Sequence, residues 1–79
     1  MLLERNGTME KRRPFVGAPT HCDVCNKTIT NAFVDGKTTM GPWANMCLAC
    51  HGKHGYGLGT GKGQLFRKMM DGHFYKEMG

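Results

Sequence analysis

The pattern of apolar and polar residues in this chain changes character along its length. Residues 28–34 are rich in β-branched and aromatic side chains, which predicts a strand. Asp35-Gly36 follows directly, and this dipeptide is typical of a two-residue hairpin turn. Residues 37–40 are expected to form the returning strand, which Gly41-Pro42 ends. The pattern therefore predicts a β-hairpin over residues 28–40.

The hydrophobic period changes at Pro42. Proline at a first helical position, followed by good helix formers and closed by Gly55, predicts a short helix or turn over residues 42–55. A second helix is predicted over residues 64–77, where apolar side chains recur at helical spacing. Its apolar stripe is expected to pack against Trp43 and the hairpin, or else to form a partner surface. The stripe consists of Leu65, Phe66, Met69, Met70 and then His73 or Phe74.

Two segments lack such a pattern. Residues 1–20 are polar, interrupted by glycine and proline, and carry the basic trio Lys11-Arg12-Arg13, which predicts a flexible basic arm. Residues 55–63 have glycine at every second position and are expected to form a loop. This loop is not a nucleotide-binding P-loop, because Tyr56 and Gly63 stand where that motif needs Gly and Ser or Thr.

Size and composition limit the stability of the fold. The chain has 79 residues, of which 39% are apolar and twelve are glycine. A core of this size is marginal without a cross-link or a metal ion. We therefore expect residues 21–79 to form one small domain whose folding depends on a bound metal.

The four cysteines form the strongest motif in the sequence. Cys22 and Cys25 form one C-x-x-C pair, and Cys47 and Cys50 form a second pair after a spacer of 21 residues. Two such pairs can supply four thiolates to one tetrahedral zinc ion, and this closed ligand set predicts a structural site. Asn26, directly after the first pair, suits the left-handed conformation of a zinc knuckle.

Histidines close to the cysteines leave a second ligand set open. His21 precedes Cys22, His51 follows Cys50, and His54 lies one helical turn beyond it. A site with three cysteines and one histidine is therefore an alternative to the four-cysteine site. Knuckle, hairpin and helix in this order predict a small α+β domain of the treble-clef type with a C-terminal helix. A zinc ribbon is the alternative.

Disulfide bonds and haem attachment are the two alternative uses of the cysteines. Disulfides are typical of secreted domains, but the first residues form no signal peptide and no segment is long enough to span a membrane, so we expect a cytoplasmic protein. Cys47-Leu48-Ala49-Cys50-His51 also matches the c-type haem attachment motif, with His51 and a later methionine as axial ligands. That hypothesis leaves the first cysteine pair unexplained. No enzymatic activity is expected, because the chain is too short for the folds that use such a pair in redox chemistry.

The net charge suggests a partner. Eleven basic residues against six acidic residues give a formal charge of +5, which favours an acidic partner such as nucleic acid. The basic residues expected to contact phosphates are Lys53, Lys62, Arg67 and Lys68. The alternative is a module that binds a host protein, such as RNA polymerase or a nuclease, through Trp43, Tyr56, Phe66 and Phe74.

A long combined pattern carries a family resemblance. CDVCNKTIT followed by FVDGKTTMGPWANMCLACHGKHGYGLGTGKGQLFRK resembles small zinc-finger-like proteins of bacteriophages and prophages. The resemblance implies a zinc-binding domain of phage origin that binds the phage nucleic acid or a host protein. The two cysteine pairs are also similar to the TraR/DksA-type zinc finger, which acts on RNA polymerase. The present chain lacks the long coiled coil of those proteins, so their mechanism does not carry over.

Overall fold

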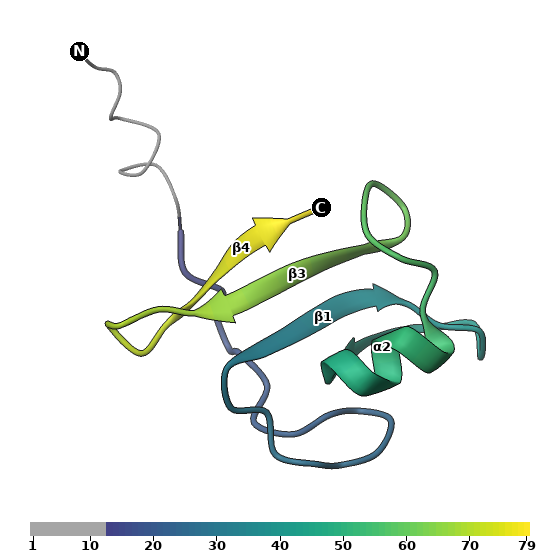
Figure 1. Ribbon diagram of the computed structural model, residues 1–79, viewed down its shortest axis with the longest axis horizontal. Coiled ribbons are helices and arrows are strands. Elements are labelled where there is room, and N and C mark those ends of the chain that lie inside the picture. Colours follow the sequence, from purple (N-terminus) through teal and green to yellow (C-terminus); the bar gives the residue numbers. More distant parts are fainter. Residues whose placement is uncertain (1–12) are drawn as a thin grey trace.

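A four-stranded antiparallel sheet and one short helix make up the fold (Figure 1). The computed structural model describes residues 13–79. Within them the strand order is β2-β1-β3-β4, which confirms the expected α+β class. No helix in this range is long and apolar enough to cross a membrane. In chain order the elements are β1 (Ala32–Lys37), β2 (Trp43–Met46), α2 (Leu48–His54), β3 (Gly63–Lys68) and β4 (Phe74–Met78).

The β1–β2 hairpin turns later than the sequence predicted. Asp35-Gly36 lies inside β1, where Gly36 is the register partner of Gly63 on β3. A Cβ atom at Gly36 would lie 3.0 Å from the carbonyl oxygen of Lys62, so glycine allows a close approach of strands here and makes no turn. The chain reverses instead between Thr38 and Pro42.

A buried threonine holds this turn. The Thr38 hydroxyl donates a 2.8 Å hydrogen bond to the Pro42 carbonyl oxygen, and the Thr38 side chain is 2% exposed. Gly41 has a φ of +111°, which glycine adopts at little cost, and its N–H donates to the Thr38 carbonyl oxygen. The helix expected over residues 42–55 therefore begins only at Leu48, and the residues after Pro42 form β2.

The C-terminal helix predicted over residues 64–77 is wrong. These residues form strands β3 and β4, which pair with each other in an antiparallel hairpin. Leu65 and Phe66 are adjacent and both buried, because both faces of the sheet are covered at β3. A strand buried on both faces loses the alternation that identifies strands, and its apolar run then resembles a helical stripe.

The β3–β4 turn uses the second Asp-Gly pair of the chain. Gly72 has a φ of +86° and donates its N–H to the carbonyl oxygen of Met69. Asp71 accepts hydrogen bonds from the His73 N–H at 2.9 Å and from the Tyr75 hydroxyl at 2.7 Å. These bonds, led by the one from Tyr75, lower the pKa of Asp71. The turn therefore forms for two reasons: Gly72 adopts a positive φ, and the Asp71 side chain accepts hydrogen bonds from residues after the turn.

One core is a cluster of phenylalanine rings. Phe33, which is fully buried, stacks on Phe66 with ring centroids 5.1 Å apart and meets Phe74 edge-on at 5.0 Å. Phe15 adds edge-on contacts to Phe33 at 5.1 Å and to Phe66 at 4.7 Å. Such pairs each contribute about 0.5–1.5 kcal/mol beyond burial. Ile29 completes the buried cluster.

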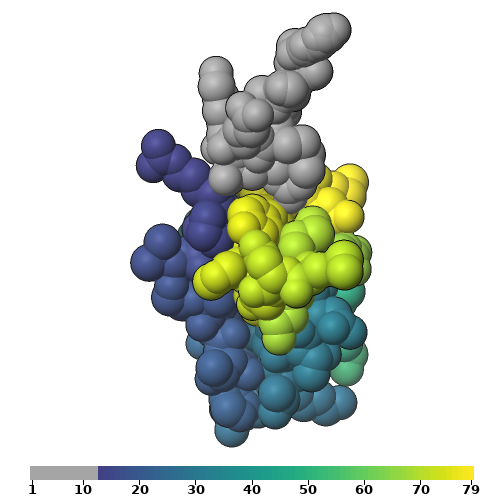
Figure 2. All heavy atoms as spheres, turned by 90° about the vertical axis from the view of Figure 1, so that its left-hand side faces the viewer, coloured from purple at the N-terminus to yellow at the C-terminus, as the bar shows by residue number. Residues whose placement is uncertain are grey.

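The described part of the N-terminal arm predicted over residues 1–20 belongs to the folded domain. Residues 1–12 lie outside the described range. Phe15 packs into the core, and its N–H donates a 2.8 Å hydrogen bond to the carbonyl oxygen of Phe74. Figure 2 shows this purple segment beside the yellow-green β3–β4 hairpin. The domain therefore includes residues assigned from the sequence to a flexible arm.

Substitution of Phe15 tests this boundary. We expect Phe15→Ala to lower the free energy of unfolding by about 2 kcal/mol, less than the roughly 3–5 kcal/mol of a fully buried phenylalanine, because Phe15 is half-buried. Val16→Ala is the matched control, since Val16 is 92% exposed. Urea unfolding of the metal-loaded protein measures both. Equal midpoints for the two variants would place Phe15 outside the core.

Candidate metal centre

The first cysteine pair lies in a tight turn before β1. The Asn26 N–H donates to the Cys22 carbonyl oxygen at 2.9 Å, and the Cys22 N–H donates to the Lys27 carbonyl oxygen at 2.8 Å. Asn26 has a φ of +64°, which confirms the left-handed conformation expected from its position. An isolated bridge between His21 and Thr28 closes the base of the turn. The turn thus directs two thiols to one side.

The second pair lies where β2 passes into α2. Cys47 is the N-cap residue of the helix, and Cys50 lies in its first turn. Asp23 attaches the first turn to β2: its N–H donates to the Asn45 carbonyl oxygen at 2.9 Å, and its carboxylate accepts from the Asn45 N–H at 2.8 Å. This two-point contact brings the two cysteine pairs together.

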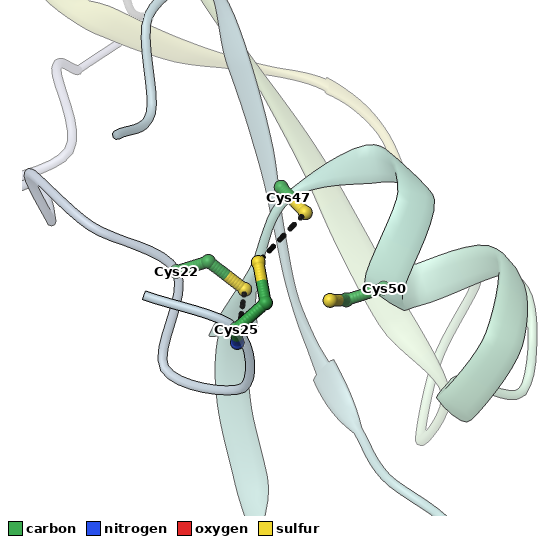
Figure 3. Close-up of side chains that lie close together, drawn as sticks. All are labelled: Cys22, Cys25, Cys47 and Cys50. Carbon is green, nitrogen blue, oxygen red and sulfur yellow. Dashed lines mark hydrogen bonds between the residues drawn. The ribbon is translucent and has the colours of Figure 1, made fainter. Parts of the chain in front are cut away.

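The four sulfur atoms converge on one point. Every pair of Sγ atoms among the four cysteines lies within 4.8 Å, and the Cys25 and Cys47 atoms are 3.8 Å apart (Figure 3). Metal–sulfur bonds of about 2.3 Å in a tetrahedron require sulfur atoms roughly 3.8 Å apart. The thiols are free, and the 3.8 Å separation is far longer than a disulfide bond. The cluster, Cys22, Cys25, Cys47 and Cys50, is therefore a possible metal site as predicted.

The thiols have unequal proton affinities. Burial raises the pKa of Cys22, but backbone hydrogen bonds from Cys25, Cys47 and Val24 outweigh it and lower the pKa to about 6. The pKa of Cys50 is raised to about 12, first by burial and then by hydrogen bonds with the other three thiols. A divalent cation would displace the remaining protons, so its affinity falls as the solution is acidified.

The nearby histidines do not join this cluster. Among residues 13–79 the convergent group contains four cysteines and no histidine. His21 Nδ1 lies 3.0 Å from the Thr20 hydroxyl, and His51 Nε2 donates to the Gly57 carbonyl oxygen at 2.9 Å. His54 ends the helix. The same geometry gives the haem hypothesis no support, since Cys47 and Cys50 face the first cysteine pair and His51 is turned to the glycine-rich loop.

His51 instead fastens the glycine-rich loop, which runs from residue 55 to residue 62, to the helix. Its ring crosses the backbone of Gly55 to reach Gly57. A Cβ atom at Gly55 would overlap Cδ2 of the His51 ring and lie 2.8 Å from the His51 carbonyl oxygen. A side chain at position 55 would therefore not fit, because the His51 ring occupies that space. Gly57 has a φ of +87°, which turns the loop.

The basic residues predicted to contact phosphates are not in one patch. Lys53 lies on α2 and Lys62 ends the glycine-rich loop, whereas Arg67 and Lys68 lie at the far end of β3. Six residues of strand separate Lys62 from Lys68, which is about 20 Å. Arg67 donates to the Glu77 carboxylate at 2.6 Å, and the Lys68 ammonium lies 5.9 Å from the Phe74 ring centroid. All four side chains are exposed.

The aromatic residues proposed as anchors fall into two classes. Phe66 and Phe74 are 7% exposed and belong to the core, so they cannot anchor a partner. Trp43 is 48% exposed and Tyr56 is 50% exposed. The sequence analysis missed Lys37, whose ammonium lies 5.7 Å from the Tyr56 ring centroid. Lys37 was not identified as a candidate from the sequence, because the hairpin turn was expected at Asp35-Gly36, directly before it.

Comparison with known proteins adds no assignment. No protein-family model, curated protein or solved structure matches this chain. The resemblance to phage zinc-finger-like proteins therefore stays a prediction.

Removal of single thiols tests the ligand set. We expect Cys22→Ser, Cys25→Ser, Cys47→Ser and Cys50→Ser each to weaken metal binding strongly, because a site with three thiolates must take its fourth ligand from water or the serine hydroxyl. His54→Ala should retain one metal ion per chain. Metal content by plasma mass spectrometry and amide NMR dispersion measure the two effects. Retention of one metal ion by any of the four serine variants, under a competing chelator that leaves the wild type loaded, would contradict the four-cysteine site.

Two glycines of the helix region offer a matched test of the loop attachment. Gly55→Ala should lower the thermal midpoint, since overpacking of this kind costs about 1–3 kcal/mol. Gly52→Ala meets no atom within 4 Å and should raise stability by about 0.5–1 kcal/mol through helix propensity. His51→Ala combined with Gly55→Ala should restore only the part of the loss that the ring contact causes, because the added Cβ atom would still lie 2.8 Å from the His51 carbonyl oxygen. If Gly55→Ala alone is neutral, the ring does not occupy the space beside the backbone.

Proposed function

We propose that this protein is a non-enzymatic zinc-binding domain that contacts nucleic acid through exposed basic residues. The convergence of four cysteine thiols within 4.8 Å of one another supports the metal-binding part of the proposal. A set of four soft thiolates in tetrahedral spacing suits zinc or an iron site, and zinc is the ion that such paired C-x-x-C turns most often bind.

The proposed site is structural. Four sulfur ligands leave no open position for a water molecule or a substrate, so the metal ion would hold the domain together without taking part in a reaction. The order of the parts supports a treble-clef assignment: a cysteine turn, a hairpin, and a helix whose first turn carries the second pair. The two additional strands β3 and β4 take the place that the sequence analysis gave to a C-terminal helix.

Charge supports the proposed partner. The chain carries a net charge of +5, and Lys53 and Lys62 are exposed lysines near one end of the sheet. Within residues 13–79 neither forms an ion pair, in contrast to Arg67, whose charge Glu77 offsets. Unpaired surface cations are available to replace the counterions of a phosphate backbone. We therefore assign the phosphate contacts chiefly to Lys53 and Lys62.

Binding of a host protein is the second candidate function. Its support is the exposure of Trp43 and Tyr56, since exposed aromatic residues are common anchors at interfaces. Phage origin would suit either function.

A salt titration tests the proposed function. We expect the zinc-loaded protein to bind single-stranded and duplex oligonucleotides at low ionic strength, with an affinity that falls linearly on a log–log plot against salt. Replacement of Lys53 and Lys62 by glutamine should reduce the slope by about one unit per lysine. Arg67→Gln should change the slope less, because Glu77 offsets the charge of Arg67. Absence of binding to any oligonucleotide at low salt would refute nucleic-acid binding.

A further inference from the structure

Two exposed aromatic rings and a lysine lie next to one another at one end of the sheet. Lys37 on β1 is the register partner of Trp43 on β2, so their side chains project from the same face with Cβ atoms about 4.5–5.5 Å apart. The Lys37 ammonium also lies 5.7 Å from the Tyr56 ring centroid. The three residues form an aromatic–lysine–aromatic platform.

The platform continues a sheet face that is core elsewhere. Phe33 and Lys37 lie four residues apart on β1 and therefore project from the same face. Phe15 and Ile29 cover the Phe33 end of this face. The Lys37 end is exposed, as are Trp43 at 48% and Tyr56 at 50%. Exposed aromatic rings at the uncovered end of this face are available for a ligand.

A hollow adjoins the tryptophan. It has a volume of about 400 Å³, and it is lined by the apolar residues Trp43, Met40, Pro42, Val24 and Ala44 together with Thr38 and the acidic Asp23. This volume lies within the range of small-ligand sites. A planar group that stacks on the Trp43 ring could therefore also contact apolar walls beside it.

Backbone hydrogen bonds bring two further lysine-bearing segments to the same end of the sheet. The Lys37 N–H donates to the Lys62 carbonyl oxygen at 2.9 Å, so the two lysines are backbone neighbours. Lys53 precedes His54, whose carbonyl oxygen accepts a hydrogen bond from the Thr39 N–H at 2.8 Å, two residues after Lys37. Of these lysines, Lys37 lies against an aromatic ring, and Lys62 is its neighbour on the backbone. Asp35, which is half-buried on the same face as Lys37, limits the positive potential near the sheet centre.

We propose that the Trp43–Lys37–Tyr56 platform binds unpaired bases of single-stranded nucleic acid. This proposal rests on the proposed nucleic-acid function and narrows it to single strands. Bases would stack on Trp43 and Tyr56, while Lys37 and Lys62 contact the adjacent phosphates. Stacking on aromatic side chains together with a basic track is the common mode of single-strand binding without base-specific hydrogen bonds. Paired bases in a duplex do not expose their faces to such a platform.

The single tryptophan of the chain gives a direct readout. Because Trp43 is the only tryptophan in the sequence, its fluorescence reports stacking at the platform alone. We expect an oligothymidylate of about 12 nucleotides, within the usual site size of single-strand binders, to quench this fluorescence. An abasic phosphodiester of the same length and charge should bind more weakly and leave the fluorescence almost unchanged. Equal quenching by both polymers would overturn the proposal, since no base would then be stacked.

Variants test the affinity. Trp43→Ala and Tyr56→Ala should each weaken binding of the labelled oligothymidylate by about 10-fold or more, and leave duplex affinity and the salt slope unchanged. Trp43→Phe and Tyr56→Phe should retain most of the affinity. Met70→Ala is the control, since Met70 is a fully exposed apolar residue in the β3–β4 turn. Metal content and amide dispersion identify any alanine variant that does not fold. At such a position, the affinity of the phenylalanine variant for oligothymidylate is the test.

The outcomes separate this proposal from the function on which it rests. Equal affinity for single strand and duplex, unaffected by Trp43→Ala, would refute the platform and leave nucleic-acid binding intact. Absence of binding to every oligonucleotide would refute both. A host protein retained by the wild type and lost with Trp43→Ala, in the absence of oligonucleotide binding, would assign the platform to a protein partner and overturn the proposal.

Discussion

The convergence of four cysteine thiols from two separate segments is the constraint on which the rest of the structure depends. A tight turn holds one pair, and the junction of a strand and a helix holds the other. Their sulfur atoms lie close enough to share one ion, and this arrangement lowers the pKa of Cys22 and raises the pKa of Cys50. In a small domain the binding free energy of a structural metal is folding free energy. The helix and β2 are therefore positioned by the site as much as they position it.

The sheet connects the cysteine site to the rest of the molecule. One core surrounds the cysteines and includes Met46 of β2, which pairs with Val34 of β1. The other core consists of phenylalanine rings around Phe33, the immediate neighbour of Val34. Because successive residues of a strand project to opposite faces, β1 contributes to both cores at once. Loss of either core would leave one face of this strand exposed.

Glycine is required at several positions for different structural reasons. Gly36 and Gly63 face each other across β1 and β3, where added side chains would meet the neighbouring backbone. Gly55 leaves room for the ring of His51, and Gly57 turns the loop by a positive φ. Each such position costs conformational entropy on folding. That cost supports the proposal that a chain with this composition needs a metal ion in addition to its two small cores.

The cysteine spacing alone determined the composition of the candidate metal centre, because the geometry of a C-x-x-C turn depends on its local sequence. Asn26, which adopts the left-handed conformation, likewise identified the first turn from the sequence. The strand pairing was decided only by tertiary structure. Both Asp-Gly pairs carry the same local turn signal, yet only Asp71-Gly72 turns, since Gly36 is needed for close packing against Gly63. The last two strands, predicted as a helix, are strands because covering elements bury β3 on both faces and hide its period. The Trp43–Lys37–Tyr56 platform likewise arises from register and loop placement, which no local pattern specifies.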